Sequence, residues 1–265
     1  MTSRRQALGM AAAGVLTLAG CTPGPRHAVA SPAKRGPSGG KAPTGSASPS
    51  ALPPPSHALT RGDGPDGSVT GTGSPAVALT FDDGPDPVNT PKILDLLGEN
   101  DVKATFSLVG FRARDYPGVV RRIAAEGHTL CNHSWQHLMD LGHRPLSYLK
   151  WDLTQTTNAI NTAAPDTPVR YFRAPGGNFT PGLVDQVREY GMTPLFWNVD
   201  PRDWDSASYG YGESMVTHIV GTVQANVKPG RIVLSHDCKH PDTVAAYAIL
   251  LPWLKARYTL IALPT

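Results

Sequence analysis

The sequence has few cysteines, no basic excess in its later part and no long apolar run, and each shortage excludes a class of protein. Three cysteines in 265 residues are too few for a disulfide framework, and they lack zinc-finger spacing. The uncharged apolar run over residues 7–20 is shorter than the roughly 20 residues that a membrane-spanning helix needs. From residue 75 onward, 17 Lys and Arg stand against 19 Asp and Glu, which does not indicate a nucleic-acid partner.

Residues 1–21 are predicted to be an export signal. Arg4 and Arg5 precede the apolar run, and the segment closes with Leu18-Ala19-Gly20-Cys21. The paired arginines resemble a twin-arginine signal, and Leu-Ala-Gly-Cys resembles the lipobox of bacterial lipoproteins, with Cys21 as the lipidated residue. The alternative is an ordinary secretory signal with an incidental cysteine. We expect an exported protein, anchored by lipid on the outer face of the cell membrane.

Residues 22–74 are predicted to be a disordered linker. They show no periodicity, and more than half of them are Pro, Gly or Ser. Such a segment cannot bury enough apolar surface to offset the entropy lost on ordering. As a flexible coil it would span about 40 Å on average, which suits a tethered catalytic domain that reaches into a cell wall.

From residue 75 onward the sequence alternates between strands and helices. Apolar runs predict strands over 76–79, 104–109, 128–131, 169–173, 193–199, 231–235 and 258–262. Helical patterns lie between the strands. The first predicted helix has Thr90 as its N-cap, and further helices are predicted over 119–126, 147–163, 181–191, 214–226 and 243–257. Repeated strand–helix units predict a parallel sheet with right-handed crossovers. With about seven strands, we expect an α/β fold, a distorted or incomplete (β/α) barrel.

The stretch Thr80-Phe81-Asp82-Asp83-Gly84-Pro85 follows the first strand. In parallel α/β proteins, chemistry takes place at the carboxyl ends of strands. Two adjacent carboxylates raise one pKa unless a cation or a positive side chain keeps both ionised. Asp82 and Asp83 are therefore candidate site residues, although Asp, Gly and Pro also occur in plain turns.

The next candidates, His133 and His137, follow the third strand. Four residues apart, they would lie on one face of a helical turn and could bind one cation. Alone, this spacing is more often chance than a metal site. Together with one aspartate, two histidines leave an open coordination position, which is the layout of a catalytic rather than a structural site.

Three later strand ends also carry polar side chains. Arg173 could pair with a strand-end aspartate, and the glycines at 176 and 177 expose backbone N–H groups that suit an oxyanion. Asp203 and Trp204 follow the next strand, and His236 ends the strand after that, where a proton donor would be useful. Taken alone, the first two stretches are also readable as ordinary turns, and a single histidine such as His236 is more often structural.

Two cysteines remain once Cys21 is assigned to the lipid. Cys131 and Cys238 each lie close in sequence to a candidate site histidine, so the two could be neighbours in space. An exported protein permits a disulfide between them, and two separately buried thiols are the alternative.

Taken in order, these five stretches resemble the motifs of the polysaccharide deacetylases, carbohydrate esterase family 4, which share the chitooligosaccharide deacetylase homology domain. The likeness covers residues 75–265. It implies a distorted (β/α) barrel and metal-dependent removal of acetyl groups from a polymeric sugar. It also implies a divalent cation, with zinc favoured and cobalt, manganese or nickel as alternatives.

The resemblance implies one role for each residue. Asp82 would be the general base, His236 the general acid, and Asp83, His133 and His137 the metal ligands. Arg173 would hold Asp82 ionised, Asp203 would tune His236, and Trp204 and Leu234 would form the walls of the acetyl pocket. The family usually has Tyr where this chain has Gly176, whose N–H could still face the oxyanion.

The sequence therefore predicts a metal-dependent deacetylase of N-acetylated amino-sugar polymers or oligomers, peptidoglycan or chitooligosaccharide, at the cell surface. An acetylxylan O-deacetylase would use the same residues. A non-catalytic carbohydrate-binding lipoprotein on the same fold is the third possibility, but no ligand, base or acid position is substituted. We expect a monomer whose partners are an acetylated saccharide and, through the lipid alone, a membrane, with no nucleic acid.

Overall fold

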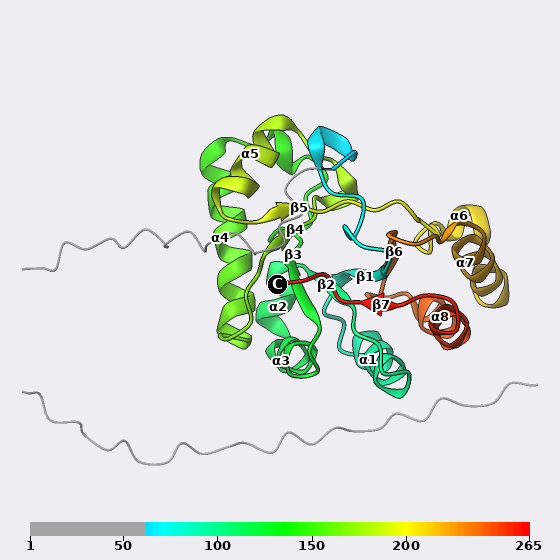
Figure 1. Cartoon of the computed structure of the whole chain (residues 1–265). Coiled ribbons are helices and arrows are strands. Elements are labelled where there is room, and N and C mark those ends of the chain that lie inside the picture. Colours follow the sequence, from blue (N-terminus) through cyan, green and yellow to red (C-terminus); the bar gives the residue numbers. More distant parts are fainter. Residues whose placement is uncertain (1–61) are drawn as a thin grey trace, which may run out of the picture. The chain divides into compact units, whose positions relative to one another are not determined.

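Seven parallel strands form the centre of the described part of the chain, residues 62–265, in the computed structural model (Figure 1). They are β1 (Val77–Gly84), β2 (Thr105–Leu108), β3 (Thr129–Asn132), β4 (Tyr171–Phe172), β5 (Thr193–Pro194), β6 (Ile232–His236) and β7 (Leu260–Ile261). Their order is β5-β4-β3-β2-β1-β6, and β7 pairs with the first residues of β1. The predicted parallel sheet is confirmed.

Helices surround these strands (Figure 1). They are α1 (Asn89–Glu99), α2 (Gly110–Asp115), α3 (Pro117–Ala125), α4 (Leu146–Ala163), α5 (Pro181–Glu189), α6 (Ser206–Tyr209), α7 (Glu213–Asn226) and α8 (Pro241–Lys255). Three short 3-10 turns, η1 (Pro65–Gly67), η2 (Leu141–His143) and η3 (Pro175–Gly177), complete the described elements. The sequence did not predict α2 and α6, because helices this short carry little periodic signal.

The start of α1 differs from the prediction that Thr90 caps it. The helix begins at Asn89, and the Asp86 carboxylate accepts the N–H groups of Val88 and Asn89 at 2.9 and 2.8 Å. The Thr90 hydroxyl instead donates to the carboxylate of Asp237, beyond the end of β6. Thr90 therefore links the first turn of α1 to the loop that follows β6.

The sheet closes through an irregular segment rather than through two regular strands. Beyond Pro194, the Leu195 N–H still donates to β4, at Phe172 O (2.8 Å). The chain then crosses to β6, where the Val199 N–H donates to Ile232 O (3.2 Å) and the Val199 carbonyl accepts from Leu234 N–H (2.9 Å). The expected strand over 193–199 is therefore regular only in β5, and the closed sheet is consistent with the predicted distorted barrel.

Apolar side chains fill both faces of the strands. Val69, Ala78, Tyr171, Leu195 and Ile232 belong to one buried cluster, and Phe81 and Phe106 belong to a second, larger one that includes side chains of the surrounding helices. The Phe81 ring lies 5.3 Å from the Phe106 ring and 4.8 Å from that of Tyr247 on α8. Burial on both faces explains why the central strands lack polar alternation.

The folded region begins before residue 75, so the assignment of residues 62–74 to the linker does not hold. The Val69 side chain is buried, its N–H donates to Pro194 O (2.8 Å), and its carbonyl accepts from Phe196 N–H (2.7 Å). Thr72 N–H donates to Gly230 O (3.0 Å). Backbone hydrogen bonds to distant segments hold this stretch, and composition gives no sign of them. The predicted export signal, Cys21 and linker residues 22–61 lie outside the described residues.

The last residues of the chain run across the amino ends of the strands. Leu263 is buried, its N–H donates to Thr105 Oγ1 (3.0 Å), and its carbonyl accepts from Thr129 Oγ1 (2.6 Å). The Tyr171 hydroxyl donates to Pro264 O (2.6 Å). This segment covers the end of the barrel opposite to the candidate site residues.

Cys131 and Cys238 are free thiols, and both are buried. Of the two possibilities that the sequence left open, the structure therefore shows separate thiols rather than a disulfide. Burial raises the pKa of each thiol to about 12, so neither is a reactive thiolate at neutral pH.

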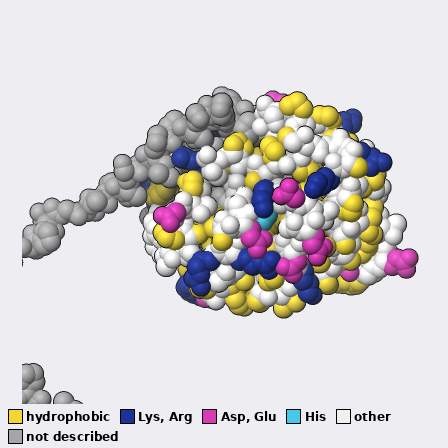
Figure 2. All heavy atoms as spheres, turned by 60° about the horizontal axis from the view of Figure 1, so that its bottom comes forward, with side chains coloured by type: hydrophobic (Ala, Val, Ile, Leu, Met, Phe, Trp, Pro, Cys, Tyr) yellow, Lys and Arg dark blue, Asp and Glu magenta, His cyan; other side chains and the backbone are white. Residues whose placement is uncertain are grey.

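The surface offers no large area of one charge on the face that Figure 2 shows. Lys and Arg side chains are interspersed there with Asp and Glu. Among the described residues, Arg122 contacts both Asp95 and Glu126 at 2.6 Å. Within residues 62–265, no helix combines the length and the apolar character that a bilayer span requires.

Candidate active site

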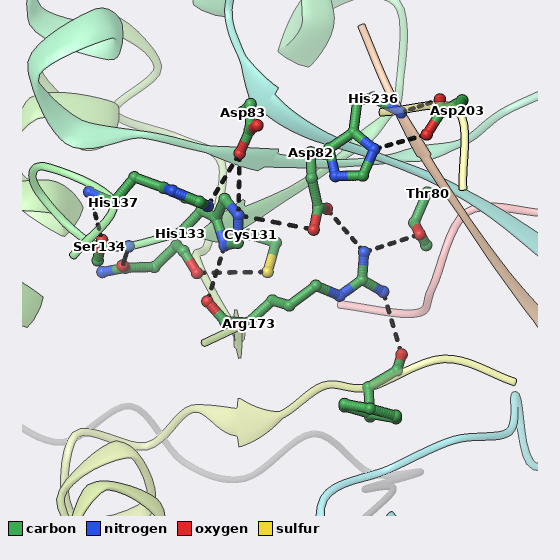
Figure 3. Close-up of polar contacts among 12 residues, drawn as sticks. Thr80, Asp82, Asp83, Cys131, His133, Ser134, His137, Arg173, Asp203 and His236 are labelled. Atoms are coloured by element: carbon green, nitrogen blue, oxygen red, sulfur yellow. Dashed lines mark hydrogen bonds and ion pairs between the residues drawn. The ribbon is translucent and has the colours of Figure 1, made fainter. Parts of the chain in front are cut away.

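The turn at the end of β1 brings two adjacent carboxylates to one place. Neighbouring side chains in a regular strand point to opposite faces. Here the register shifts between Asp82 and Gly84, and Asp83 has a positive φ of 70°. As a result, Asp82 Oδ2 and Asp83 Oδ1 lie 3.6 and 3.3 Å from the same atom, His133 Nε2 (Figure 3).

Arg173 holds the Asp82 carboxylate by a buried ion pair. Its guanidinium is fully buried, and Nη1 donates to Asp82 Oδ1 at 2.7 Å and to Thr80 Oγ1 at 2.8 Å. Nη2 donates to Phe196 O at 3.1 Å. The structure thus brings together the predicted pair of Arg173 and Asp82, in which a buried carboxylate has a cationic partner, while Asp82 Oδ2 faces His133.

Asp83, His133 and His137 form one cluster of possible metal ligands. Asp83 Oδ1 lies 3.3 Å from His133 Nε2 and 3.1 Å from His137 Nε2, and all three ligand atoms lie within 4.8 Å of one another. Tetrahedral ligands at about 2.1 Å from one zinc ion stand roughly 3.4 Å apart, so the spacing fits a single ion. Asp83 Oδ1 is buried and has no hydrogen-bond donor, which also fits a ligand atom.

The surroundings of this cluster prepare it for a cation. His133 Nδ1 donates to Arg173 O at 2.8 Å, which fixes the tautomer that leaves a lone pair on Nε2. Burial alone would raise the pKa of Asp83. The imidazoles of His133, His236 and His137 outweigh burial and hold this pKa well below its usual range.

The two histidines do not lie on a helical turn, as their spacing predicted. Ser134 and His137 have positive φ angles of 65° and 57°, so the segment is an irregular loop. Ser134 Oγ accepts from His137 N–H at 2.9 Å, which folds the loop back on itself. Both imidazoles thus approach Asp83 from an irregular loop and not from one face of a helix.

His236 and Asp203 form the second predicted pair. His236 Nδ1 lies 2.7 Å from Asp203 Oδ1, while Asp203 Oδ2 accepts from His236 N–H and from Thr243 Oγ1, each at 2.7 Å. Burial lowers the pKa of His236, but the Asp203 carboxylate outweighs it and raises that pKa to about 10. These contacts also hold the pKa of the buried Asp203 below its usual value. The imidazole is therefore oriented and kept protonated at neutral pH.

Gly176 occupies a position that disfavours the tyrosine usual in the family. It has a φ of 60°, and a Cβ built there would lie 2.3 Å from Cε of Met139. Met139, half exposed, takes the space beside this backbone, and its carbonyl accepts from Asn178 Nδ2 at 2.9 Å. A tyrosine would need both a strained backbone and a displaced Met139.

The two remaining predicted residues differ in exposure. Leu234 is buried in β6 and, by strand alternation, points to the same face as His236. Trp204 is 47% exposed, and the Arg202 guanidinium lies 5.1 Å from its ring. Leu234 can therefore form a wall, and Trp204 can form an edge of the mouth.

Two buried carboxylates near the site were not identified as site residues from the sequence. Asp152 on α4 accepts from the Trp135 N–H within the histidine loop. Asp237 accepts from the Thr90 hydroxyl, and burial raises its pKa to about 7. In the sequence, Asp152 is a single acid among the apolar residues of a predicted helix, and Asp237 directly follows the His236 motif. Neither feature indicates that the carboxylate is buried.

A parallel (β/α) barrel with this cluster and these two pairs at the carboxyl ends of its strands defines the class: a carbohydrate esterase of family 4. The chain belongs to the polysaccharide deacetylase family, whose model matches residues 70–195. It shares that family with named deacetylases along most of its described length.

Three similar proteins illustrate the family. A chitooligosaccharide deacetylase of Sinorhizobium fredii is 39% identical over 202 residues, which cover 71% of this chain and 89% of that protein. A peptidoglycan-N-acetylglucosamine deacetylase of Bacillus cereus is 37% identical over 183 residues, 68% of this chain and 81% of that protein. The crystal structure of the peptidoglycan N-acetylglucosamine deacetylase Bc1960 is 32% identical, with a TM-score of 0.67 over 74% of this chain and 89% of that one.

Proposed function

We propose that this chain hydrolyses acetyl groups from N-acetylated amino-sugar polymers or oligomers, of the peptidoglycan or chitooligosaccharide type. One observation carries the proposal. Asp82, held by Arg173 through one oxygen, presents its other oxygen within 3.6 Å of a nitrogen of the metal-ligand cluster. A base and a cation site thus adjoin where a water molecule could be activated.

Asp83, His133 and His137 would hold the divalent cation. Such a cation lowers the pKa of water and polarises a carbonyl. Two imidazoles and one carboxylate suit zinc, and mixed nitrogen and oxygen ligands also accept cobalt, manganese or nickel.

The protein's own residues account for the proton transfers. Asp82 takes the proton of the attacking water, and Arg173 keeps the carboxylate oriented toward it. The N–H of Gly176 donates to the oxygen that gains charge when the acetyl carbon becomes tetrahedral. His236 gives its proton to the departing amine when the carbon–nitrogen bond breaks, and Asp203 stabilises the imidazolium beforehand. Acetate and a free amine result.

Acetate release by the full chain tests the proposal. We would strip metal from the protein, restore zinc or cobalt, and offer chitopentaose, N-acetylated peptidoglycan and acetylxylan in parallel. Metal-restored release from either of the first two substrates supports the proposal, and a preference for acetylxylan would reassign the enzyme to O-deacetylation. Bound metal without release from any of the three would favour a carbohydrate-binding protein.

We also propose that the protein is exported, with Arg4 and Arg5 in a twin-arginine signal and Cys21 lipidated. A tether of this kind supports a substrate within reach of the cell's own surface, which favours peptidoglycan over distant polymers. The test is membrane partition of the Cys21→Ala variant in the natural host. Release of the variant from the membrane fraction supports the lipid anchor, and unchanged partition contradicts it.

A further inference from the structure

We infer that Asp152 of α4 is a positioning residue for the loop of residues 133–137, and that it thereby sets the affinity of the site for its metal. The inference rests on the proposed metal site. Asp152 contacts none of the three ligand side chains. Its part would be to hold the backbone between His133 and His137 in the one conformation that directs both imidazoles at Asp83.

The loop needs external support. Ser134 and His137 adopt left-handed conformations, which side chains other than glycine disfavour. Such conformations persist only where surrounding contacts impose them. Since these two residues include one ligand and the neighbour of the other, a relaxed loop would separate the ligand atoms.

Asp152 supplies one of those contacts from the inside of the protein. The side chain has no solvent exposure, and both of its carboxylate oxygens lie 3.0 Å from the Trp135 N–H. This N–H is the carboxylate's single hydrogen-bond donor among residues 62–265. Trp135 lies midway between the two histidines, so the bond fixes the centre of the loop.

Packing of α4 alone does not explain an acid at this position. Leu149, Leu153 and Ile160 on the same helix are buried and apolar. Burial raises the pKa of Asp152 to about 6, so the carboxylate is largely ionised at neutral pH. Burying a charged group costs free energy, and a hydrogen bond from one N–H offsets little of it. An apolar side chain would serve the helix better, which leaves the loop as the reason for the acid.

The other contacts of the loop act on different atoms. Gly110 N–H donates to Ser134 O (2.9 Å) and Phe111 N–H donates to Trp135 O (3.2 Å). Asn132 Oδ1 accepts from Ser134 N–H (3.0 Å). Removal of Asp152 would therefore leave one specific donor, the Trp135 N–H, buried without an acceptor, while every other loop contact stays possible.

The test uses the full chain with Asp152→Ala and the isosteric Asp152→Asn, which retains one acceptor. Ile160→Val, two turns further along α4, is the matched control. The first readout is amide hydrogen exchange at Trp135 in metal-free protein. The second is zinc affinity, measured by competition with a chromophoric chelator.

We expect faster exchange at Trp135 in both Asp152 variants and zinc affinity reduced by about tenfold to a hundredfold in Asp152→Ala, with a smaller loss in Asp152→Asn. Ile160→Val should lower the unfolding temperature without changing either readout. If Asp152→Ala does not fold, Asp152→Asn decides the question alone.

Zinc affinity within twofold of the wild type, together with an unchanged Trp135 exchange rate, overturns the inference. The outcome is separable from that of the proposed function. If zinc binding depends on Asp152 but the wild type releases no acetate, only the proposed activity is contradicted. If the wild type releases acetate but zinc binding does not depend on Asp152, only the positioning role is contradicted.

Discussion

At the scale of single residues, each acidic group of the site has a different partner, and the partner indicates its part in the chemistry. Asp82 bonds to a guanidinium, Asp83 faces two imidazoles, and Asp203 accepts three hydrogen bonds around His236. Of these three carboxylates, only that of Asp83 has a buried oxygen without a hydrogen-bond donor. This difference separates a metal ligand from a base and from a carboxylate that orients an acid.

The Asp203→Asn variant tests how His236 is kept protonated. In the folded protein Asp203 raises the pKa of His236 from its usual 6.5 to about 10. The contribution of this ion pair to the free energy of unfolding is therefore complete below pH 6.5 and is lost as the pH rises through 10. Without the carboxylate charge, this pKa should fall by roughly one to three units. The basic limb of the kcat/KM profile should move to lower pH by a similar amount.

An unchanged basic limb in Asp203→Asn would show that another group, not His236, sets it. Asp205→Asn is the matched control, because Asp205 lies two residues away and pairs with Arg202 rather than with His236. Its profile should match that of the wild type.

At the scale of elements, the sequence predicted the order of strands and helices and the strand ends that carry Asp82, His133, Arg173 and His236. Those features depend on local apolar patterns. Three others could not be predicted, because distant backbone groups determine them. The stretch around Val69, the crossing from β5 to β6 and the irregular histidine loop all depend on hydrogen bonds between segments far apart in the chain.

The segment at the amino ends of the strands should stabilise the fold without affecting the site. Leu263→Ala removes a buried side chain and should cost about 2–5 kcal/mol in the free energy of unfolding, measured by denaturant titration. Zinc affinity of the remaining folded protein should not change, because the site lies at the opposite ends of the strands. Leu146→Ala is the control: its side chain is exposed, and we expect a change within about 0.5 kcal/mol.

A Leu263→Ala cost below about 1 kcal/mol would contradict the close packing of this segment. Reduced zinc affinity in the same variant would contradict the separation of the two ends.

At the scale of the whole molecule, the barrel assigns stability and chemistry to opposite ends. The C-terminal residues cover the amino ends of the strands, and all eight residues proposed to act in the reaction lie at or near the carboxyl ends. No covalent cross-link between the described cysteines contributes to this arrangement. The buried clusters and the hydrogen-bonded sheet hold it together.

The free thiols give a prediction for the intact protein. Alkylation after unfolding without a reductant should modify both Cys131 and Cys238, and a reductant should leave the unfolding temperature unchanged. Mass spectrometry of the two peptides measures the modification. A peptide pair that resists alkylation until reduced would reveal a disulfide and contradict the structure.

The most direct test of the account compares two adjacent residues, Asp82 and Asp83. We would measure bound zinc and acetate release for Asp82→Asn, Asp83→Asn and the wild type under the same conditions. The account predicts that Asp82→Asn keeps zinc and loses turnover by about 10²–10⁴-fold, whereas Asp83→Asn loses both. Equal loss of zinc in the two variants, or wild-type acetate release that persists without metal, would contradict it.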